Sequence, residues 1–370
     1  MDLRITAAAG ALSLLALPAR APAQSEVPSF AYEAAVRRYV SGDREGAVAE
    51  MAAWPEGRLR DQIPAFNRLW QSARACSDCP AASAWQRIPV RAALMLHSDC
   101  AQRVRRDGAP PRLHESAAWS IARVLKDDPA HRVFARRWYE AMAGLAQAEN
   151  RWGDALDWAE RGLRDFPDSA ETLLVVGSIE ETAAVLTAPR VSQEALVDPN
   201  TRKTRSALLE AREVRDHLEK AGRALRSAVA ADPTLSEARL RQGRVAWRLG
   251  EAAEARSTLE ELLARNPPAN PAFLAHLFLG RVHEDAGRLD DAARSYEAAL
   301  RLQAQSQSAR LALSHVHLRQ GDGAAARADT ETALRPAGNR RTPDPFWLYP
   351  WGPSVGVEER LEALRHEVAP

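Results

Sequence analysis

The residues with the clearest capacity for chemistry are three cysteines and a histidine in the first third of the chain. Cys76 and Cys79 are spaced as C-x-x-C, and His97 and Cys100 follow as H-x-x-C. On a helix the second pair would point the same way, because residues three apart share a face. Three thiolates and one imidazole form a known tetrahedral ligand set for structural zinc. A metal-binding or redox module at these four residues is therefore one hypothesis for the function.

A disulfide is the competing interpretation of the same residues. In an oxidising compartment paired thiols tend to become disulfides, and a bridge from Cys100 to Cys76 or to Cys79 would leave one free thiol. Redox catalysis is disfavoured, since no strand and helix pattern of a thioredoxin-like domain surrounds the C-x-x-C pair. His97 could equally pack inside a helical unit without a ligand. We expect no cofactor, with zinc as the minority alternative.

The N-terminal residues indicate the cellular compartment in which the protein is found. Residues 1–23 have an early arginine, an apolar run from Ile5 to Leu17 and a small-x-small triplet that ends at Ala23. This pattern predicts a secretory signal peptide cleaved after Ala23, and an ordinary amphipathic helix is disfavoured because the run has no polar face. We therefore expect a periplasmic or secreted protein with no membrane span in the mature chain.

The net charge and the missing motifs argue against two classes of function, nucleic-acid binding and catalysis. The 370-residue chain has a formal net charge of +1, so no global field would attract nucleic acid. It contains no Gly-rich phosphate loop, G-x-S-x-G elbow, H-E-x-x-H or C-x-x-C-H motif. Adjacent acids such as Asp127 and Asp128 would lie on different sides of a helix, so they fit turns or caps. We expect a protein that is not an enzyme and does not bind nucleic acid.

The elements that must position these residues repeat with a period of about 34 residues. The clearest unit has Gly243 and Ala255 where two antiparallel helices approach, Gly250 at the turn and Pro267 at the stop. The pattern recurs at Gly280, Gly287 and Ala292, and again at Gly321 and Ala326. Each unit is a helix pair that cannot bury its apolar face alone, so neighbouring pairs must stack.

These three consecutive units resemble the tetratricopeptide repeat family, and weaker copies extend the resemblance over roughly residues 30–336. Asn150 stands where the turn of one weaker copy would have glycine. The resemblance implies an all-α fold, a right-handed superhelical solenoid of antiparallel helix pairs. It also implies that the first helix of each pair lines a concave groove, which holds a peptide or a partner helix.

We expect four segments along the chain. Residues 1–23 are the leader, 24–131 are degenerate N-terminal repeats with the cysteine cluster, and 132–336 are the tetratricopeptide-like repeats. An insertion at 187–206 separates the two helices of one unit, and 337–370 form a C-terminal capping segment. Insertions in solenoids map to one face, often the binding face, although a surface loop without a role is the simpler interpretation.

The family pattern places a set of candidate partner-binding residues on the inner faces of the first helices. They are Leu240, Arg244, Trp247, Arg248, Leu277, Arg281, Glu284, Asp285, Leu311, His315, Leu318 and Arg319. Guanidinium groups hold carboxylates in bidentate geometry, and Trp247 would supply an aromatic anchor. We expect a protein or peptide ligand, acidic or C-terminal, although the asparagines that clamp a terminal carboxylate in some family members are missing. The simpler alternative is solvated arginines paired with Glu237 and Glu284.

The last segment interrupts the repeat with aromatic residues among prolines. These residues are Phe346, Trp347, Tyr349 and Trp351. A solenoid needs a cap over its exposed apolar end, so we expect them to fold back onto the last helix pair, before a short helix from Val357 to Val368. The alternative is an aromatic platform that binds a glycan or the cell wall. The favoured function is a non-catalytic protein–protein interaction scaffold or adaptor in the cell envelope.

Overall fold

The computed structural model describes residues 30–61, 89–187, 202–335 and 343–368. All regular secondary structure in these ranges is helical, which confirms the predicted all-α class. The chain divides into a first unit up to Val124, joined by the last residues from Val368, and a second unit from Leu125 to Glu367. None of the described helices combines the length and the apolar character needed to cross a membrane.

The first unit is built on one helix whose first half is almost fully buried. Its helices are α1 (Phe30–Val40), α2 (Arg44–Ala52), α5 (Val90–Arg106) and α6 (Arg112–Leu125). Every side chain of α5 from Ala92 to Ser98 is buried, and the helix packs against α1 and α2. Helix α2 begins where the Asp43 side chain accepts a hydrogen bond from the Gly46 amide, as an N-cap does.

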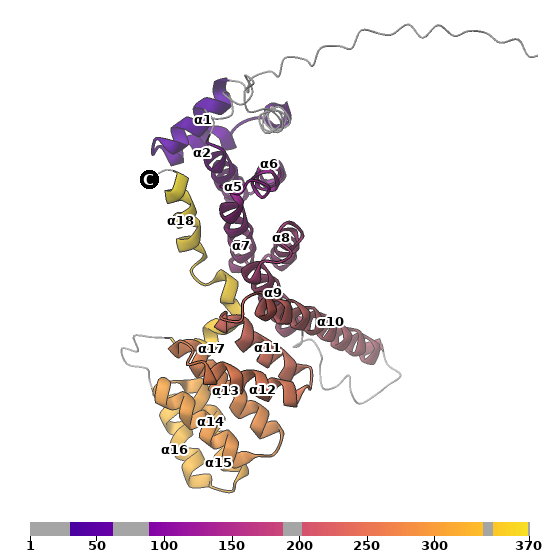
Figure 1. Cartoon of the computed structure of the whole chain (residues 1–370), viewed down its shortest axis with the longest axis vertical. Coiled ribbons are helices and arrows are strands. Elements are labelled where there is room, and N and C mark those ends of the chain that lie inside the picture. Colours follow the sequence, from indigo (N-terminus) through magenta and orange to yellow (C-terminus); the bar gives the residue numbers. More distant parts are fainter. Residues whose placement is uncertain (1–29, 62–88, 188–201, 336–342, 369–370) are drawn as a thin grey trace, which may run out of the picture. The chain divides into compact units, whose positions relative to one another are not determined.

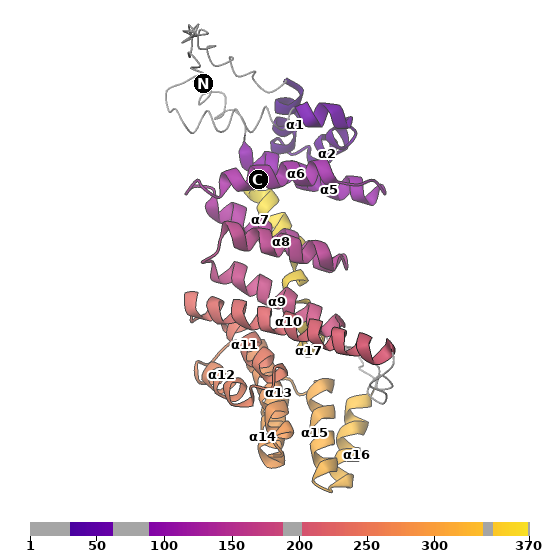
Figure 2. The same cartoon turned by 90° about the vertical axis from the view of Figure 1, so that its right-hand side faces the viewer.

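The second unit is a row of helix pairs. Its helices are α7 (Arg132–Ala148), α8 (Trp152–Asp165), α9 (Ala170–Thr187), α10 (Arg202–Ala231), α11 (Ser236–Arg248), α12 (Ala252–Ala264), α13 (Ala269–Asp285), α14 (Leu289–Leu302), α15 (Gln307–Arg319) and α16 (Gly323–Leu334). Each odd-numbered helix packs most extensively against the helix that follows it. Figures 1 and 2 show these pairs stacked one after another from α7 to α16.

A left-handed turn residue follows the first helix of four of these pairs. It is Asn150, Gly250, Gly287 or Gly321, with φ between 58° and 86°. The amide after the turn bonds five residues back, as from Glu251 to the Ala246 carbonyl at 2.9 Å. Glycine adopts this conformation without strain and asparagine tolerates it, so Asn150 preserves the turn.

Missing side chains let the two helices of a pair come close together. A Cβ added at Gly243 would lie 2.7 Å from Leu259 Cγ, and one added at Gly280 would lie 2.4 Å from Tyr296 Cε1. The predicted small-residue positions therefore mark the helix contacts. Residues 188–201, most of the predicted insertion, lie outside the described residues, and the flanking helices α9 and α10 still pack as a pair.

The C-terminal segment crosses the first helices instead of covering the last pair. It comprises α17 (Pro345–Leu348), the 3₁₀ helix η3 (Tyr349–Ser354) and α18 (Val357–Val368). Helix α17 packs on α13 and η3 packs on α9 and α7 (Figure 1). The predicted position of the aromatic residues on the last helix pair is therefore wrong. The physical reason is that these earlier helices offer buried partners to the aromatic rings and to the backbone carbonyls of Tyr349 and Pro350.

Candidate functional site

Tyr349 of η3 lies at the centre of a buried cluster between α9, α11 and α13. Its side chain is 4% exposed and belongs to the same apolar core as α11 to α15. The ring meets the Phe278 ring edge to face, with centroids 5.1 Å apart and planes at 73°. The guanidinium carbon of Arg241 lies 4.3 Å from the Tyr349 ring centroid, and that of Arg244 lies 4.8 Å from it. Aromatic and cation contacts thus enclose the ring.

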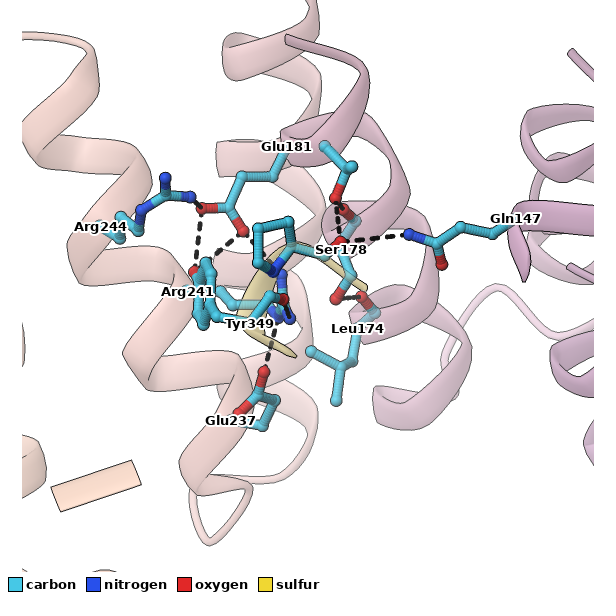
Figure 3. Close-up of polar contacts among 10 residues, drawn as sticks. Gln147, Leu174, Ser178, Glu181, Glu237, Arg241, Arg244 and Tyr349 are labelled. Carbon is cyan, nitrogen blue, oxygen red and sulfur yellow. Dashed lines mark hydrogen bonds and ion pairs between the residues drawn. The ribbon is translucent and has the colours of Figure 1, made fainter. Parts of the chain in front are cut away.

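Glu181 of α9 joins the two arginines to the tyrosine (Figure 3). Its Oε2 accepts from Arg241 Nη1 at 2.8 Å, and its Oε1 accepts from Arg244 Nη1 at 2.5 Å. The Tyr349 hydroxyl donates to both carboxylate oxygens, at 2.9 and 3.0 Å. The side chains of Glu181 and Arg241 are each 1% exposed. Glu237 completes the set by accepting from Arg241 Nε at 2.7 Å.

Charges in this cluster compensate one another, because Glu181 and Glu237 face Arg241 and Arg244. Burial lowers the pKa of Arg241, but the electrostatic effects of Tyr349, Glu237 and Glu181 more than offset burial and raise that pKa. Burial and the Glu181 carboxylate raise the pKa of the Tyr349 hydroxyl well above its usual value. The tyrosine therefore stays neutral and acts as a hydrogen-bond donor to the carboxylate.

Side chains of three first helices bind the backbone of the segment. Arg241 Nη2 donates to the Tyr349 carbonyl at 2.8 Å. The next carbonyl, that of Pro350, accepts from Thr182 Oγ1 at 2.7 Å and from Gln147 Nε2 at 3.2 Å. Two consecutive carbonyls are thus satisfied by side chains of α7, α9 and α11.

Glycines on both sides allow the segment to approach this closely. A Cβ added at Gly144 of α7 would lie 2.2 Å from the Pro353 carbonyl oxygen, which is backbone and cannot move aside easily. A Cβ added at Gly352 would lie 2.3 Å from Arg241 Nη2. We call the faces of α7, α9, α11 and α13 that contact residues 344–355 the covered groove.

Asp344 holds the start of the segment against the last described repeat. Its Oδ1 accepts from the Phe346 amide at 3.0 Å and so caps α17. Its Oδ2 accepts from the Ser308 amide at 3.0 Å and from Ser306 Oγ at 2.8 Å, both at the start of α15.

The inner faces of α13 and α15 carry a second polar cluster around Glu284, whose side chain is 2% exposed. Its carboxylate accepts from Tyr296 at 2.8 Å and from His315 Nδ1 at 2.5 Å, and it pairs with Arg281 at 3.3 Å and Arg319 at 3.4 Å. Burial raises the pKa of Glu284, but the Tyr296 hydrogen bond, the Arg281 charge and the His315 contact outweigh burial and lower it. Glu284 is therefore a buried carboxylate with half-exposed cationic partners.

Arg248 lies at the C-terminal end of α11 with an unused donor. Its Nη1 is buried and has no hydrogen-bond partner among the described residues. Burial and repulsion by Arg244 lower the pKa of the Arg248 guanidinium. The neighbouring Trp247 donates from Nε1 to Asp285 Oδ2 at 2.8 Å. We use the name open groove for the residues around Glu284 and Asp285 on the predicted inner faces, which are Trp247, Arg281, Glu284, Asp285, His315, Leu318 and Arg319.

The tetratricopeptide repeat family model matches this part of the chain three times, at residues 207–271, 240–306 and 277–341. Residues 207–341 are therefore similar to the tetratricopeptide repeat family. Over these residues the match confirms the resemblance predicted from the glycine and alanine spacing. No curated protein matches the chain.

Two solved structures that are similar to this chain are both of MamA. A crystal structure of MamA has 18% sequence identity and a TM-score of 0.40, and the match covers 56% of this chain and 93% of that one. MamA from Desulfovibrio magneticus RS-1 has 14% identity and a TM-score of 0.40, with 56% and 97% covered.

The predicted groove residues divide between two environments. Leu240, Arg244 and Leu277 are buried or nearly so, and Arg244 is bound to Glu181 beneath the C-terminal segment. Arg281, His315, Leu318 and Arg319 are together in the open groove, where their side chains are partly or largely exposed. The alternative of arginines paired with neighbouring glutamates describes Arg281 and Arg319 with Glu284, and it also describes Arg241 with Glu237. It does not describe Arg248 Nη1, which has no hydrogen-bond partner among the described residues.

The predicted cysteine and histidine cluster is only partly described, because Cys76 and Cys79 lie outside the described residues. Cys100 is buried, and its thiol donates to the Val48 carbonyl at 3.7 Å. Burial raises the pKa of the Cys100 thiol. No three histidine, cysteine or acidic side chains of the described chain are grouped so that they could hold a metal ion. The zinc and disulfide interpretations both stay predictions.

His97 uses both ring nitrogens inside the first unit. Its Nε2 lies 3.2 Å from the Tyr32 hydroxyl oxygen, and its Nδ1 lies 3.1 Å from His114 Nδ1. Burial, with the neighbouring His114, lowers the pKa of His97 well below its usual value. Burial also lowers the pKa of His114 to about 4. These contacts make His97 part of a buried polar cluster with neutral imidazoles near pH 7.

The C-terminal aromatic residues do not form a flat exposed row. Tyr349 is buried, Phe346 packs on Phe278, and Trp351 packs on Trp152 with ring centroids 5.8 Å apart. Trp347 alone among the four is largely exposed, at 56%. This arrangement gives the glycan-binding alternative no extended stacking surface.

Several residues that build the covered groove were not predicted from the sequence. They are Gly144, Gln147, Glu181, Thr182 and Arg241. One signal for them existed: Glu180 and Glu181 interrupt an otherwise apolar helix, and a buried carboxylate requires a cationic partner. The identity of that partner depends on the fold, because Arg241 follows 60 residues later.

Proposed function

We propose that this protein is a non-catalytic interaction scaffold of the cell envelope, and that its open groove binds an acidic segment of a partner protein. Stacked helix pairs present a preformed surface, so a bound segment does not have to order its receptor. The leader-like residues 1–23 support export, and fractionation of cells that make the full chain tests the location.

The observation that carries the proposal is the exposure of two guanidinium groups in the open groove. Arg281 and Arg319 both pair with Glu284, and Arg281 Nε also lies 4.0 Å from Asp285 Oδ1. The Arg281 and Arg319 side chains remain 47% and 39% exposed. The exposed donors of these two guanidinium groups would bind a carboxylate of a partner segment.

An apolar side chain lies in the same place. Leu318, on the exposed face of α15, is 63% exposed, and no described residue covers it. A single exposed leucine is common on a protein surface. Beside the arginines, however, it adds a contact for an apolar residue of the bound segment. The preferred ligand is therefore a segment that combines acidic and apolar side chains.

Site-specific crosslinking tests this function directly. A photoreactive residue at Leu318 should crosslink to a partner protein in cells, whereas the same residue at Leu302 of α14, also exposed, should not. The Arg281→Gln and Arg319→Gln double variant should lose the adduct. Arg294→Gln, which removes an exposed arginine from α14, should keep it. Equal adducts from all variants would contradict the proposal.

A further inference from the structure

The covered groove holds its occupant in the way that a receptor holds a peptide. We propose that the covered groove is a second peptide-binding site, that it accepts a partner segment with a buried tyrosine followed by proline, and that residues 344–355 are its exchangeable resident ligand. The inference rests on the proposed scaffold function and adds to it a partner chemistry and a competitor built into the chain.

The contacts to the occupant combine one inserted ring with recognition of the backbone. Tyr349 enters a pocket formed by Glu181, Arg241 and Phe278, where its hydroxyl and its ring both find partners. The carbonyls of Tyr349 and Pro350 accept from side chains of the first helices. Proline fixes its own φ and has no amide hydrogen to satisfy, which suits a segment held through its carbonyls.

The occupant has little structure of its own. Helix α17 has four residues and η3 has six, so neither can form a core without the helices beneath them. The helix pairs of the second unit, by contrast, pack against each other along the row. Repeats of this kind are stabilised mainly by their neighbours. The row of pairs therefore does not require the segment in order to fold.

The covered groove without its resident segment would expose mostly polar side chains to water. Of the side chains that contact the occupant, Glu181, Arg241, Gln147 and Thr182 are polar, and water can replace the hydrogen bonds that the segment makes. Phe278 and Trp152 supply the aromatic contacts of the site. A groove of this composition can be uncovered without causing the protein to aggregate, whereas a purely apolar surface would aggregate when uncovered.

Steric limits define which partner segments fit. The Gly352 Cα lies so close to Arg241 that an added Cβ would clash, and this residue is three positions after the tyrosine. Phe346, three positions before it, packs on Phe278 with centroids 6.4 Å apart. A partner should therefore carry an aromatic residue, then tyrosine and proline, then glycine, with the spacing Phe-x-x-Tyr-Pro-x-Gly.

A labelled peptide with the sequence of residues 344–356 provides the test. Its binding to purified full-length protein is followed by fluorescence anisotropy. Tyr349→Ala and Gly352→Ala each weaken the resident segment but leave the receptor surface intact. The peptide should bind both variants at least ten-fold more tightly than the wild type, because the resident segment lowers the fraction of open receptor. Trp347→Ala, which alters an exposed ring of the segment, should behave like the wild type.

Specificity controls come from the peptide and from the receptor. A peptide with alanine in place of its tyrosine should not bind any form. Gly144→Ala combined with Gly352→Ala should abolish binding of the wild-type peptide, because the new methyl group occupies the position of the Pro353 carbonyl. Circular dichroism checks that each variant is folded, and Gly352→Ala decides the test if Tyr349→Ala does not fold.

Equal affinity for wild type and variants, or no binding to folded variants, would overturn the inference. Such a result leaves the crosslinking test of the open groove unaffected. If instead no partner crosslinks at Leu318 but the peptide exchanges as expected, the open-groove ligand is refuted and the proposal for the covered groove stands. The two proposals can therefore fail separately.

Discussion

Replacing Glu181 with glutamine should be among the most destabilising single changes in the second unit. The substitution keeps the size of the side chain and removes one of two negative charges from a cluster that is balanced by Arg241 and Arg244. Arg244 Nη1, 2.5 Å from the carboxylate, loses its counter-ion, and Arg241 keeps only Glu237. Breaking a buried pair by removing one partner costs about 3–5 kcal/mol.

Urea unfolding followed by far-UV circular dichroism measures this effect. With a slope near 3 kcal/mol per M, the expected loss lowers the midpoint by roughly 1 M or more. The matched control is Glu237→Gln, which removes the other carboxylate from Arg241. The Glu237 side chain is 36% exposed, so water replaces much of its interaction, and we expect a loss below about 1 kcal/mol.

The comparison between the two variants is what tests the reasoning. If Glu181→Gln remains within about 1 kcal/mol of the wild type, the buried pair does not hold the C-terminal segment in place. An equal loss for both variants would show that burial does not set the strength of these pairs. Either outcome would refute the account of the cluster given above.

Two further changes test the helix contacts and the first unit. Gly280→Ala should lower the free energy of unfolding by about 1–3 kcal/mol, because its Cβ would lie 2.4 Å from Tyr296 Cε1. Gly153→Ala is the control, since no atom lies within 4 Å of its Cβ, and it should be neutral or stabilising in thermal melts. Equal melting temperatures would contradict this. Burial lowers the pKa values of His97 and His114, so below about pH 6.5 the unfolded state binds more protons than the folded state. The free energy of unfolding should therefore be highest above that pH and fall as the pH is lowered toward about 4. The expected decrease is up to about 1.4 kcal/mol per pH unit for each histidine. A His97→Asn and His114→Asn double variant should lose this slope in a pH series of melts, and an unchanged slope would exclude these residues as its source.

Local patterns in the sequence were sufficient to predict the helix pairs. Gly243 and Gly280 mark the sites where paired helices touch, because a larger side chain would clash there. Gly250 marks a left-handed turn, because glycine adopts a positive φ without strain. Both requirements arise within one helix pair. The final helix also has the predicted bounds, Val357 to Val368. Such features depend on residues that are near in sequence, so a single chain reveals them.

The destination of the aromatic segment could not be predicted in this way. Tyr349 binds Glu181, which is 168 residues away, and nothing near either residue specifies the other. A capping role is the general expectation for a terminal segment, but the buried acid in α9 and the glycine at position 144 made a different site more favourable. Charge and shape complementarity between distant surfaces appears only when the fold is known.

The contact between Tyr349 and Glu181 also has a consequence for the order of events during synthesis. The receptor helices are complete once α13 ends at Asp285, roughly 60 residues before Tyr349 is added. Ribosomes add about 5–20 residues per second, and domains fold from the N-terminal side as they emerge. Each newly made chain therefore passes several seconds with its tyrosine pocket formed and empty. If the covered groove binds a partner as proposed, that partner would meet the site during this interval, before the resident segment exists, and the first complex of a new chain would be decided on the ribosome or at the export machinery.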